Sequence, residues 1–339
     1  MSQFQVNTIT DRSGTSGPVI AGVSTNNSTG CMIIPAGPTE HRGGRGRGLF
    51  AGGNPSVNTI QFITISSTGD SEDFGDLTQA RSAAASASSS TRGIRAGGNP
   101  NTDTMDYVTI SETGNAFDFG DLTEARRQFG GCSNGTRGVF FGGLVPSPSR
   151  SSKTIDFVNI ASTGNAMGFG ELIREAQANT AASDPTRGIV FGAYSQQNSA
   201  SYNIIQYVTI ATTGNAQDFG DLSVPRYAVG SLSSVTRAIT GGGYDATTYY
   251  NIIEYVTIQT LGEATDFGDL TTLTGHPGAV SNSIRGVFGG GYISPADANT
   301  NVMEFITIAS TGNASDFGDL LSAARQLSGI SDSHGGLGE

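Results

Sequence analysis

The chain repeats one block of sequence, seen most clearly as ARSAAASASSSTRGIRAGG at residues 80–98 followed by TMDYVTISETGNAFDFGDL at residues 104–122. The first marker of each copy is DFGDL or a near copy, with its Phe at Phe74, Phe119, Phe169, Phe219, Phe267 and Phe317. The second is Arg-Gly (once Arg-Ala) before an apolar pair, at Arg47, Arg92, Arg137, Arg187, Arg237 and Arg285. The third is an apolar run that starts at Ile60, Met105, Ile155, Ile205, Ile253 and Met303. Recurrence at this period predicts a repeat architecture.

The spacing between the markers separates a rigid part of the repeat from a variable part. The apolar run and the next Phe are always 14 residues apart, and that Phe and the next marker Arg are always 18 apart. The marker Arg and the next apolar run are 13, 13, 18, 18, 16 and 18 residues apart. All length differences therefore fall in one connection, as expected of a surface loop on one face.

Each copy has the composition of four short strands. RGVFFGG at residues 137–143 is apolar and ends in glycines, and TIDFVNI at residues 154–160 has apolar residues on both strand faces. The FGDL segment starts a third strand after a turn. Small residues such as RSAAASASSS at residues 81–90 suit a fourth strand packed close to an axis.

Four strands in each 45–50 residues, six times over, predict an all-β fold, a six-bladed β-propeller. A β-helix needs shorter coils, and a sandwich does not repeat. The first blade lacks its small-residue strand, whereas ARQLSGISDS at residues 324–333 follows the last repeat. We expect this C-terminal strand to close the propeller, which removes an exposed sheet edge. The propeller is predicted to span residues 43–339, with blades starting near the six marker arginines, after an N-terminal arm of residues 1–42.

This order of strands and turns resembles the kelch family of β-propellers over roughly residues 43–339, and the resemblance implies the same fold. The chain departs from the family pattern at several places. Phe stands in DFG where kelch repeats have Trp, and the Tyr expected after Gly-Gly occurs at Tyr244 and Tyr292. The third copy has Gly168 and Glu171 in place of the two Asp residues.

Composition limits the possible functions. Charged residues make up 14% of the chain, and 49 of 339 residues are glycine, which suits a turn-rich β protein rather than a helical bundle. The net charge of −11 argues against a nucleic-acid partner. No apolar stretch approaches the roughly eighteen residues of a membrane span, so no membrane insertion is expected. The N-terminus lacks the features of a secretory signal. Cys31 and Cys132 are expected to be free thiols, with a disulfide between them as the alternative.

DFG also occurs in protein kinases, but six copies without the other kinase motifs indicate a structural role. We expect each Phe to wedge between blades and each Gly to permit a tight turn. The flanking Asp residues would cap backbone amides or pair with the marker arginines. Calcium binding by these Asp residues is an alternative, although their spacing matches no calcium loop.

No other motif points to catalysis, a cofactor or a metal site. His41, His276 and His334 are scattered and form no zinc pattern with the two distant cysteines. GGRGRG at residues 43–48 resembles a phosphate loop or an RGG segment, but it ends in the first marker Arg and precedes no helix. We expect it to join the arm to the propeller, and we expect a protein without cofactor, metal or enzymatic activity.

The variable connections are the candidate recognition surface. They run over residues 144–153, 194–203, 244–251 and 292–301, and they are rich in Tyr and small polar residues. Such a composition is typical of adaptable binding surfaces and of carbohydrate contact. The candidate recognition residues are Tyr194, Tyr202, Tyr244, Tyr249, Tyr250 and Tyr292.

Residues 1–42 lie outside the repeat and are too few to bury a core of their own. The sequence of this arm resembles virion structural proteins of tailed bacteriophages, especially phages of cyanobacteria. The resemblance lies in VNTITDRSGTSGP at residues 6–18 and STGCMIIPAGPTEHRGGRGRG at residues 28–48. These tail or fibre-like proteins carry DFGDLT-type repeats. The resemblance implies that the arm attaches the protein, in multiple copies, to other virion proteins.

Three functions follow as hypotheses. The first is a tail- or fibre-associated virion protein whose loops recognise a host-surface glycan or protein, or another virion protein. The second is a capsid decoration protein with no host receptor. The third is a glycan-active enzyme on a propeller, which would need carboxylates gathered in the channel or on the loops. The long loops offer Asp245 and Asp297, too few to favour catalysis.

Overall fold

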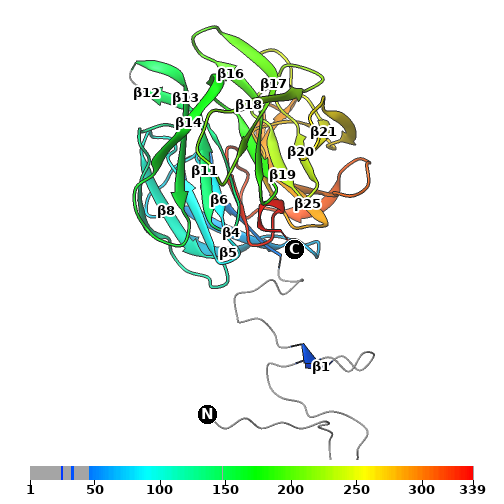
Figure 1. Ribbon diagram of the computed structural model, residues 1–339. Helices are drawn as coiled ribbons and strands as arrows, with labels where there is room; N and C mark the ends of the chain where they lie inside the picture. Colours follow the sequence, from blue (N-terminus) through cyan, green and yellow to red (C-terminus); the bar gives the residue numbers. More distant parts are fainter. Residues whose placement is uncertain (1–23, 26–31, 34–45, 147, 339) are drawn as a thin grey trace, which may run out of the picture. The chain divides into compact units, whose positions relative to one another are not determined.

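The computed structural model describes residues 24–25, 32–33, 46–146 and 148–338. The chain divides into two units, Met1–Arg42 and Gly43–Glu339. In the first unit, β1 (Ser24–Thr25) pairs antiparallel with β2 (Met32–Ile33). The second unit contains the repeats, and its described residues form six small antiparallel sheets around a central channel, a six-bladed β-propeller (Figure 1).

Each blade is built on four strands in chain order from the channel outwards, except that blade 1 takes its inner strand from the C-terminal end. Blades 3 and 6 each add a short fifth strand. The inner strands of blades 1 to 6 are β28 (Ser328–Ser331), β6 (Ala85–Ser88), β10 (Gly130–Ser133), β15 (Thr180–Ser183), β19 (Gly230–Ser233) and β24 (Gly278–Ser281). The second strands are β3 (Arg47–Ala51), β7 (Arg92–Ala96), β11 (Arg137–Phe141), β16 (Arg187–Ser195), β20 (Arg237–Gly241) and β25 (Arg285–Ser294). The third strands are β4 (Thr59–Thr64), β8 (Thr104–Thr109), β13 (Ser149–Asn159), β17 (Ala200–Thr209), β21 (Ile252–Thr257) and β26 (Ala298–Thr307). The outer strands are β5 (Glu72–Asp76), β9 (Phe117–Asp121), β14 (Met167–Ala176), β18 (Gln217–Asp221), β22 (Thr265–Asp269) and β27 (Ser315–Asp319). Two shorter strands are β12 (Leu144–Pro146) in blade 3 and β23 (Leu273–Gly275) in blade 6.

The closure of the ring confirms the prediction from the sequence. β28 pairs antiparallel with β3, with Ser328 opposite Ala51 and Ser331 opposite Gly48. The two ends of the repeat region therefore lie in one sheet, and the inner edge of β3 is paired. The second strand of every blade starts at its marker arginine, as predicted.

The variable connections differ from the predicted loops. In blades 4 and 6 the strands continue through them, so that β16 with β17 and β25 with β26 form long hairpins with short turns. In blade 3, β12 pairs with the extended start of β13. Pairing satisfies backbone groups that an irregular loop would leave to water. We call the end of the propeller that carries these connections and the crossovers between blades the loop face, and the opposite end the turn face.

A closed ring of backbone hydrogen bonds surrounds the channel at the loop face. One residue at the start of each inner strand donates its N–H to the carbonyl of its counterpart in the preceding blade, at 2.6–3.0 Å. The ring members are Ala83, Gln128, Ala178, Ala228, His276 and Gln326, all with φ between 53° and 59°. This left-handed conformation costs roughly 1 kcal/mol per non-glycine residue, a cost that one net hydrogen bond of ~1 kcal/mol can offset.

A belt of serine side chains closes the inner strands at the turn face. Each serine hydroxyl donates to the carbonyl of the equivalent serine in the preceding blade, at 2.6–2.8 Å. The belt consists of Ser88, Ser133, Ser183, Ser233, Ser281 and Ser331. All six are buried, so each hydroxyl has its partner inside the protein.

The DFGD segments join neighbouring blades at the rim. Phe74 of blade 1 is buried in one cluster with Val108 and Ile110 of blade 2, so the predicted wedge between blades is confirmed. The carbonyl of the same Phe accepts a hydrogen bond of 2.7 Å from the Gly114 amide in the next blade's turn. Equivalent amide-to-carbonyl bonds of 2.7–2.9 Å link the other blades.

Two predicted roles within this segment are wrong. Gly75 lies within β5 rather than in a tight turn, at φ 146°, and a Cβ there would lie 2.4 Å from the Gly114 carbonyl oxygen of the next blade. Glycine is therefore required by close approach between blades. The Asp76 side chain caps no amide; instead the Asp76 amide donates to the Asn115 side chain, at 3.0 Å.

The marker arginines do not pair with the DFGD carboxylates. Each lies over the aromatic ring of its own third strand, 4.3–4.5 Å from the ring centroid, and donates to a carbonyl of the next blade. Arg47, for example, lies over Phe62 and donates to the Ile110 carbonyl at 2.9 Å. The acidic side chains of the outer strands lie at the rim, where solvent screens their attraction for the arginines. The arginines therefore stay packed on the aromatic rings.

Candidate recognition surface on the loop face

The loop face is built from six equivalent backbone contacts. In each blade, the crossover residue just before the ring member bridges to the residue that follows Gly-Gly. The pairs are Arg325 with Asn54, Ser82 with Asn99, Arg127 with Leu144, Gln177 with Tyr194, Tyr227 with Tyr244, and Gly275 with Tyr292. The backbone repeats in every blade while the side chains change, so one half of this face becomes aromatic.

We call Tyr194, Tyr227, Tyr244, Tyr249 and Tyr292 the tyrosine arc. Successive ring centroids are 5.0, 5.6, 4.4 and 5.6 Å apart in that order, and the Tyr244 and Tyr249 rings are stacked. The arc therefore crosses blades 4, 5 and 6 without a gap. All five side chains are partly exposed, so the arc is a surface and not a buried core.

Glycine fixes the position of Tyr249. A Cβ at Gly275 would lie 2.7 Å from the Tyr249 ring, so the tyrosine can lie against the blade 6 crossover because that residue has no side chain. Burial, with the neighbouring tyrosines, raises the pKa of Tyr227 to about 12, and burial also raises the pKa of Tyr249. The hydroxyls of Tyr227 and Tyr249 are therefore neutral at neutral pH.

The structure brings together four of the six tyrosines singled out from the sequence. Tyr202 lies apart, where Asn198 donates to its hydroxyl at 3.0 Å and Arg174 lies over its ring. Tyr250 donates its hydroxyl to Asp245 at 2.7 Å. Sequence reasoning missed Tyr227, which lies in a crossover and not in a variable connection. Its position directly after Arg226, at the start of a small-residue strand, could have placed it at the same end of the propeller.

Outside the tyrosine arc, the loop face carries polar residues and two arginines at crossover positions. The Arg325 guanidinium lies 4.6 Å from the centroid of Tyr292, at one end of the arc. Its Nε makes no hydrogen bond, and no ion pair to Arg325 occurs among the described residues. Arg127, at the equivalent position in blade 3, instead donates to the Asn99 side chain at 2.6 Å.

The ring members on the loop face surround a channel of about 160 Å³, lined by the inner strands. Its turn-face end is covered by the C-terminal tail, which includes the short 3₁₀ helix η1 (Gly335–Leu337). A Cβ at Gly336 would lie 1.8 Å from the Ser133 carbonyl oxygen, so only glycine fits under the serine belt. His276 lines the loop-face end, and burial, with the charge of Arg325, lowers its pKa to about 4.

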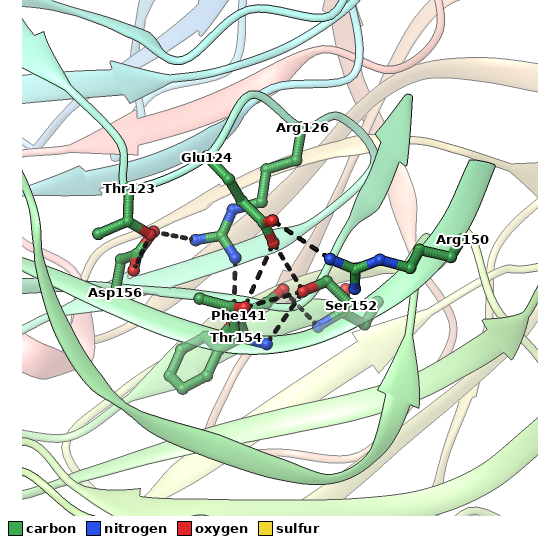
Figure 2. A network of polar contacts seen from close by, with 9 residues as sticks. Thr123, Glu124, Arg126, Phe141, Arg150, Ser152, Thr154 and Asp156 are labelled. Carbon is green, nitrogen blue, oxygen red and sulfur yellow. Dashed lines mark hydrogen bonds and ion pairs between the residues drawn. The ribbon is translucent and has the colours of Figure 1, made fainter. Parts of the chain in front are cut away.

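Figure 2 shows a polar network at the crossover from blade 2 to blade 3. Arg126 Nη2 lies 2.6 Å from Asp156 Oδ2, and both side chains are fully buried. The Thr123 hydroxyl donates to the other oxygen of Asp156, at 2.7 Å. Glu124 accepts from the Ser152 hydroxyl at 2.9 Å and faces Arg150 at 3.5 Å.

The central pair of this network recurs in other blades, which indicates a structural role. Buried pairs at the equivalent positions are Arg81 with Asp106 and Arg226 with Glu254. Where the crossover carries alanine, the facing residue is a buried glutamine: Ala176 is matched with Gln206, and Ala324 with Gln61. Blade 6 departs from this pattern, because Thr274 faces Glu304. In the other five blades the charge of the third-strand residue follows the crossover residue, since a buried carboxylate needs a partner. In blade 6, Glu304 accepts a hydrogen bond from the Thr271 amide at 2.9 Å.

Other reactive groups do not converge within the part of the chain that the structure describes. No group of three or more His, Cys, Asp or Glu residues that could hold a metal ion occurs there. Cys132 is a free buried thiol whose pKa burial raises to about 12, whereas Cys31 and His41 lie outside the described residues. No described helix is long and apolar enough to cross a membrane.

No protein-family model matches the chain, and no curated protein sequence matches it either.

Proposed function

We propose that this protein is a non-enzymatic recognition protein that binds its ligand on the loop face. The observation that carries this proposal is the tyrosine arc, a continuous row of partly exposed rings over blades 4 to 6. Tyrosine supplies a large contact area at a low cost in side-chain entropy, together with a polar hydroxyl. Single exposed aromatic residues are common on surfaces, but a contiguous row is typical of interaction sites.

The state of Asp245, one of the two carboxylates in the long connections, supports binding over catalysis. Asp245 accepts from Tyr250, from the Thr247 hydroxyl and from the amides of Thr247 and Thr248. Its burial alone would raise its pKa, but these hydrogen bonds outweigh burial and hold the pKa well below the usual range. A carboxylate in this state is a poor general acid or base near neutral pH.

We propose further that the protein is a virion structural protein of a tailed bacteriophage, associated with the tail or a fibre. The resemblance of residues 1–42 to phage virion proteins supports this role, and the arm would contact other virion proteins in multiple copies per particle. The acidic net charge of −11 supports a partner other than nucleic acid.

The test uses phage particles that carry the full chain. We expect mass spectrometry to detect the protein in purified particles, and deletion of residues 1–42 to abolish its incorporation. Particles with Tyr244→Ala and Tyr249→Ala should incorporate the protein normally but adsorb to host cells at least tenfold more slowly. Unchanged adsorption would favour capsid decoration, and absence from particles would refute the virion role. Release of glycan fragments by the purified protein would refute the non-enzymatic role.

A further inference from the structure

We propose that the loop face binds an acidic glycan, with sugar rings packed against the exposed surface of Tyr249 and Tyr292 and a carboxylate held by Arg325. This inference rests on the proposed recognition function and names the chemistry of its ligand. It follows from three features of the arc: its exposed ring surface, its hydroxyls and an adjacent arginine.

The first feature is the run of rings. Tyr244, Tyr249 and Tyr292 lie 4.4 and 5.6 Å apart between centroids, and none is fully buried. Pyranose rings present C–H groups on their flat faces, and these pack against aromatic rings while the sugar hydroxyls point outwards. Tyr244 covers one face of Tyr249, and Arg325 lies over one face of Tyr292, so a sugar chain contacts the ring surface that these neighbours leave exposed.

The second feature is the set of hydroxyls that the protein leaves unused. The hydroxyls of Tyr194, Tyr227, Tyr244 and Tyr249 make no hydrogen bond to any described residue, and none is among the buried unsatisfied atoms. They are therefore open to water or to a ligand. A polyol can both donate to them and accept from them, whereas the backbone of a proline-rich peptide offers mainly acceptors.

The third feature is Arg325. Its guanidinium lies against Tyr292, which orients it, and it forms no ion pair with the described acids. Arginine binds carboxylates through a planar fork of donors. Asp245 is held by four donors. Asp297 and Arg325 both interact with the Tyr292 hydroxyl, but no ion pair joins these two residues. His276 is neutral at pH 7 and adds no competing charge.

The experiment measures binding of the full-length protein to a panel of uronic acid oligosaccharides, namely oligogalacturonate, oligomannuronate and hyaluronan fragments. Each is compared with its carboxyl-reduced, neutral form. We expect at least one acidic oligosaccharide to bind, and its neutral form to bind at least tenfold more weakly. Tyr249→Ala should weaken binding of both forms at least tenfold. Tyr249→Phe, which keeps the ring, should cost only a few-fold.

Arg325→Gln should abolish the preference for the acidic form and leave binding of the neutral form unchanged. Two control variants should bind as the native protein does: Arg127→Gln, at the equivalent crossover position, and Tyr255→Phe, on the third strand of blade 5. Tyr255→Phe is conservative because Phe62, Phe157 and Phe305 occupy that position in other blades.

Failure of every acidic oligosaccharide to bind would overturn the inference, as would an acidic preference that survives Arg325→Gln. Binding of a proline-rich peptide on the arc with no glycan binding would do the same. Adsorption that depends on Tyr249 but is not inhibited by the oligosaccharides would refute the glycan and keep the recognition function. Adsorption that does not depend on the arc at all would refute the recognition function itself.

Discussion

The two faces of the propeller differ in whether their side chains are the same from blade to blade. At the turn face every blade contributes the same serine to the belt, with hydroxyl-to-carbonyl distances of 2.6–2.8 Å. At the loop face the backbone bridges repeat, but the side chains on them range from Asn54 and Ser82 to Tyr227 and Tyr244. Where ring closure depends on a position, all six copies keep one residue type. Where closure depends on the backbone alone, the side chains can differ between blades and can contact a ligand.

The largest effect on stability is expected in the buried pairs of arginine and acidic residue beneath the loop face. Arg126→Ala should lower the free energy of unfolding by roughly 3–5 kcal/mol, because it leaves Asp156 buried without its partner. Adding Asp156→Gln recreates the combination of Ala176 with Gln206 and should restore at least half of the loss. Urea denaturation of the single and double variants measures both values. A double variant as unstable as the single one would show that the Ala–Gln combination does not transfer between blades.

The next test uses pH. The pKa of His276 is about 4 in the folded protein, against an ordinary value near 6.5. Between these values the unfolded chain binds a proton that the folded protein does not, so stability falls as the pH is lowered from 6.5 towards 4. The expected loss is of the order of 2 kcal/mol at pH 4.5, and above about pH 7.5 this group has no effect.

His276→Gln should remove that part of the pH dependence. Glutamine is a matched substitution, because Gln128 and Gln326 adopt the same left-handed conformation at equivalent ring positions. The measurement is the difference in unfolding free energy between the two proteins at pH 7.5, 6, 5 and 4.5, which cancels the titration of the carboxylates. A difference that stays constant over this range would contradict the prediction.

A smaller effect is expected in the serine belt. Ser281 donates to the Ser233 carbonyl at 2.8 Å and accepts from the Ser233 amide at 3.2 Å. Ser281→Ala removes both contacts in a buried place and should cost about 1–2 kcal/mol in unfolding free energy. Ser283→Ala, in the adjacent turn, serves as the control and should cost less than ~0.5 kcal/mol. Equal effects of the two changes would show that the belt does not support closure.

The features that could be predicted from the sequence are those that repeat. Six copies of the Phe and Arg markers predict the number of blades, the start of each second strand and the closing strand at residues 324–333. A pattern that repeats six times shows the features that all blades share, and it does not show the contacts of a single blade. It therefore identifies the Phe wedge but does not show how a marker Arg reaches a carbonyl of the next blade.

The parts of the candidate site that could not be predicted depend on contacts between different repeats. Tyr227 belongs to a crossover, and its approach to Tyr194 and Tyr244 depends on the angle between neighbouring blades. The room for Tyr249 depends on Gly275, which is 26 residues further along the chain. The match of Ala or Arg in a crossover with Gln or an acid in the third strand becomes visible once the two positions are known to touch.

The smallest effect on stability is expected in the arc itself. Tyr249→Phe removes a hydroxyl that bonds to no described residue and keeps the ring against Gly275, so the unfolding free energy should change by less than ~0.5 kcal/mol. The comparison with Ser281→Ala is direct, because each variant deletes one oxygen atom, one on each face of the propeller. Denaturation curves for the two variants, recorded side by side, give the ratio of the effects. A loss of unfolding free energy at Tyr249 as large as that at Ser281 would mean that the arc supports the fold. The proposed contrast between a closing face that repeats in every blade and a binding face that varies would then be wrong.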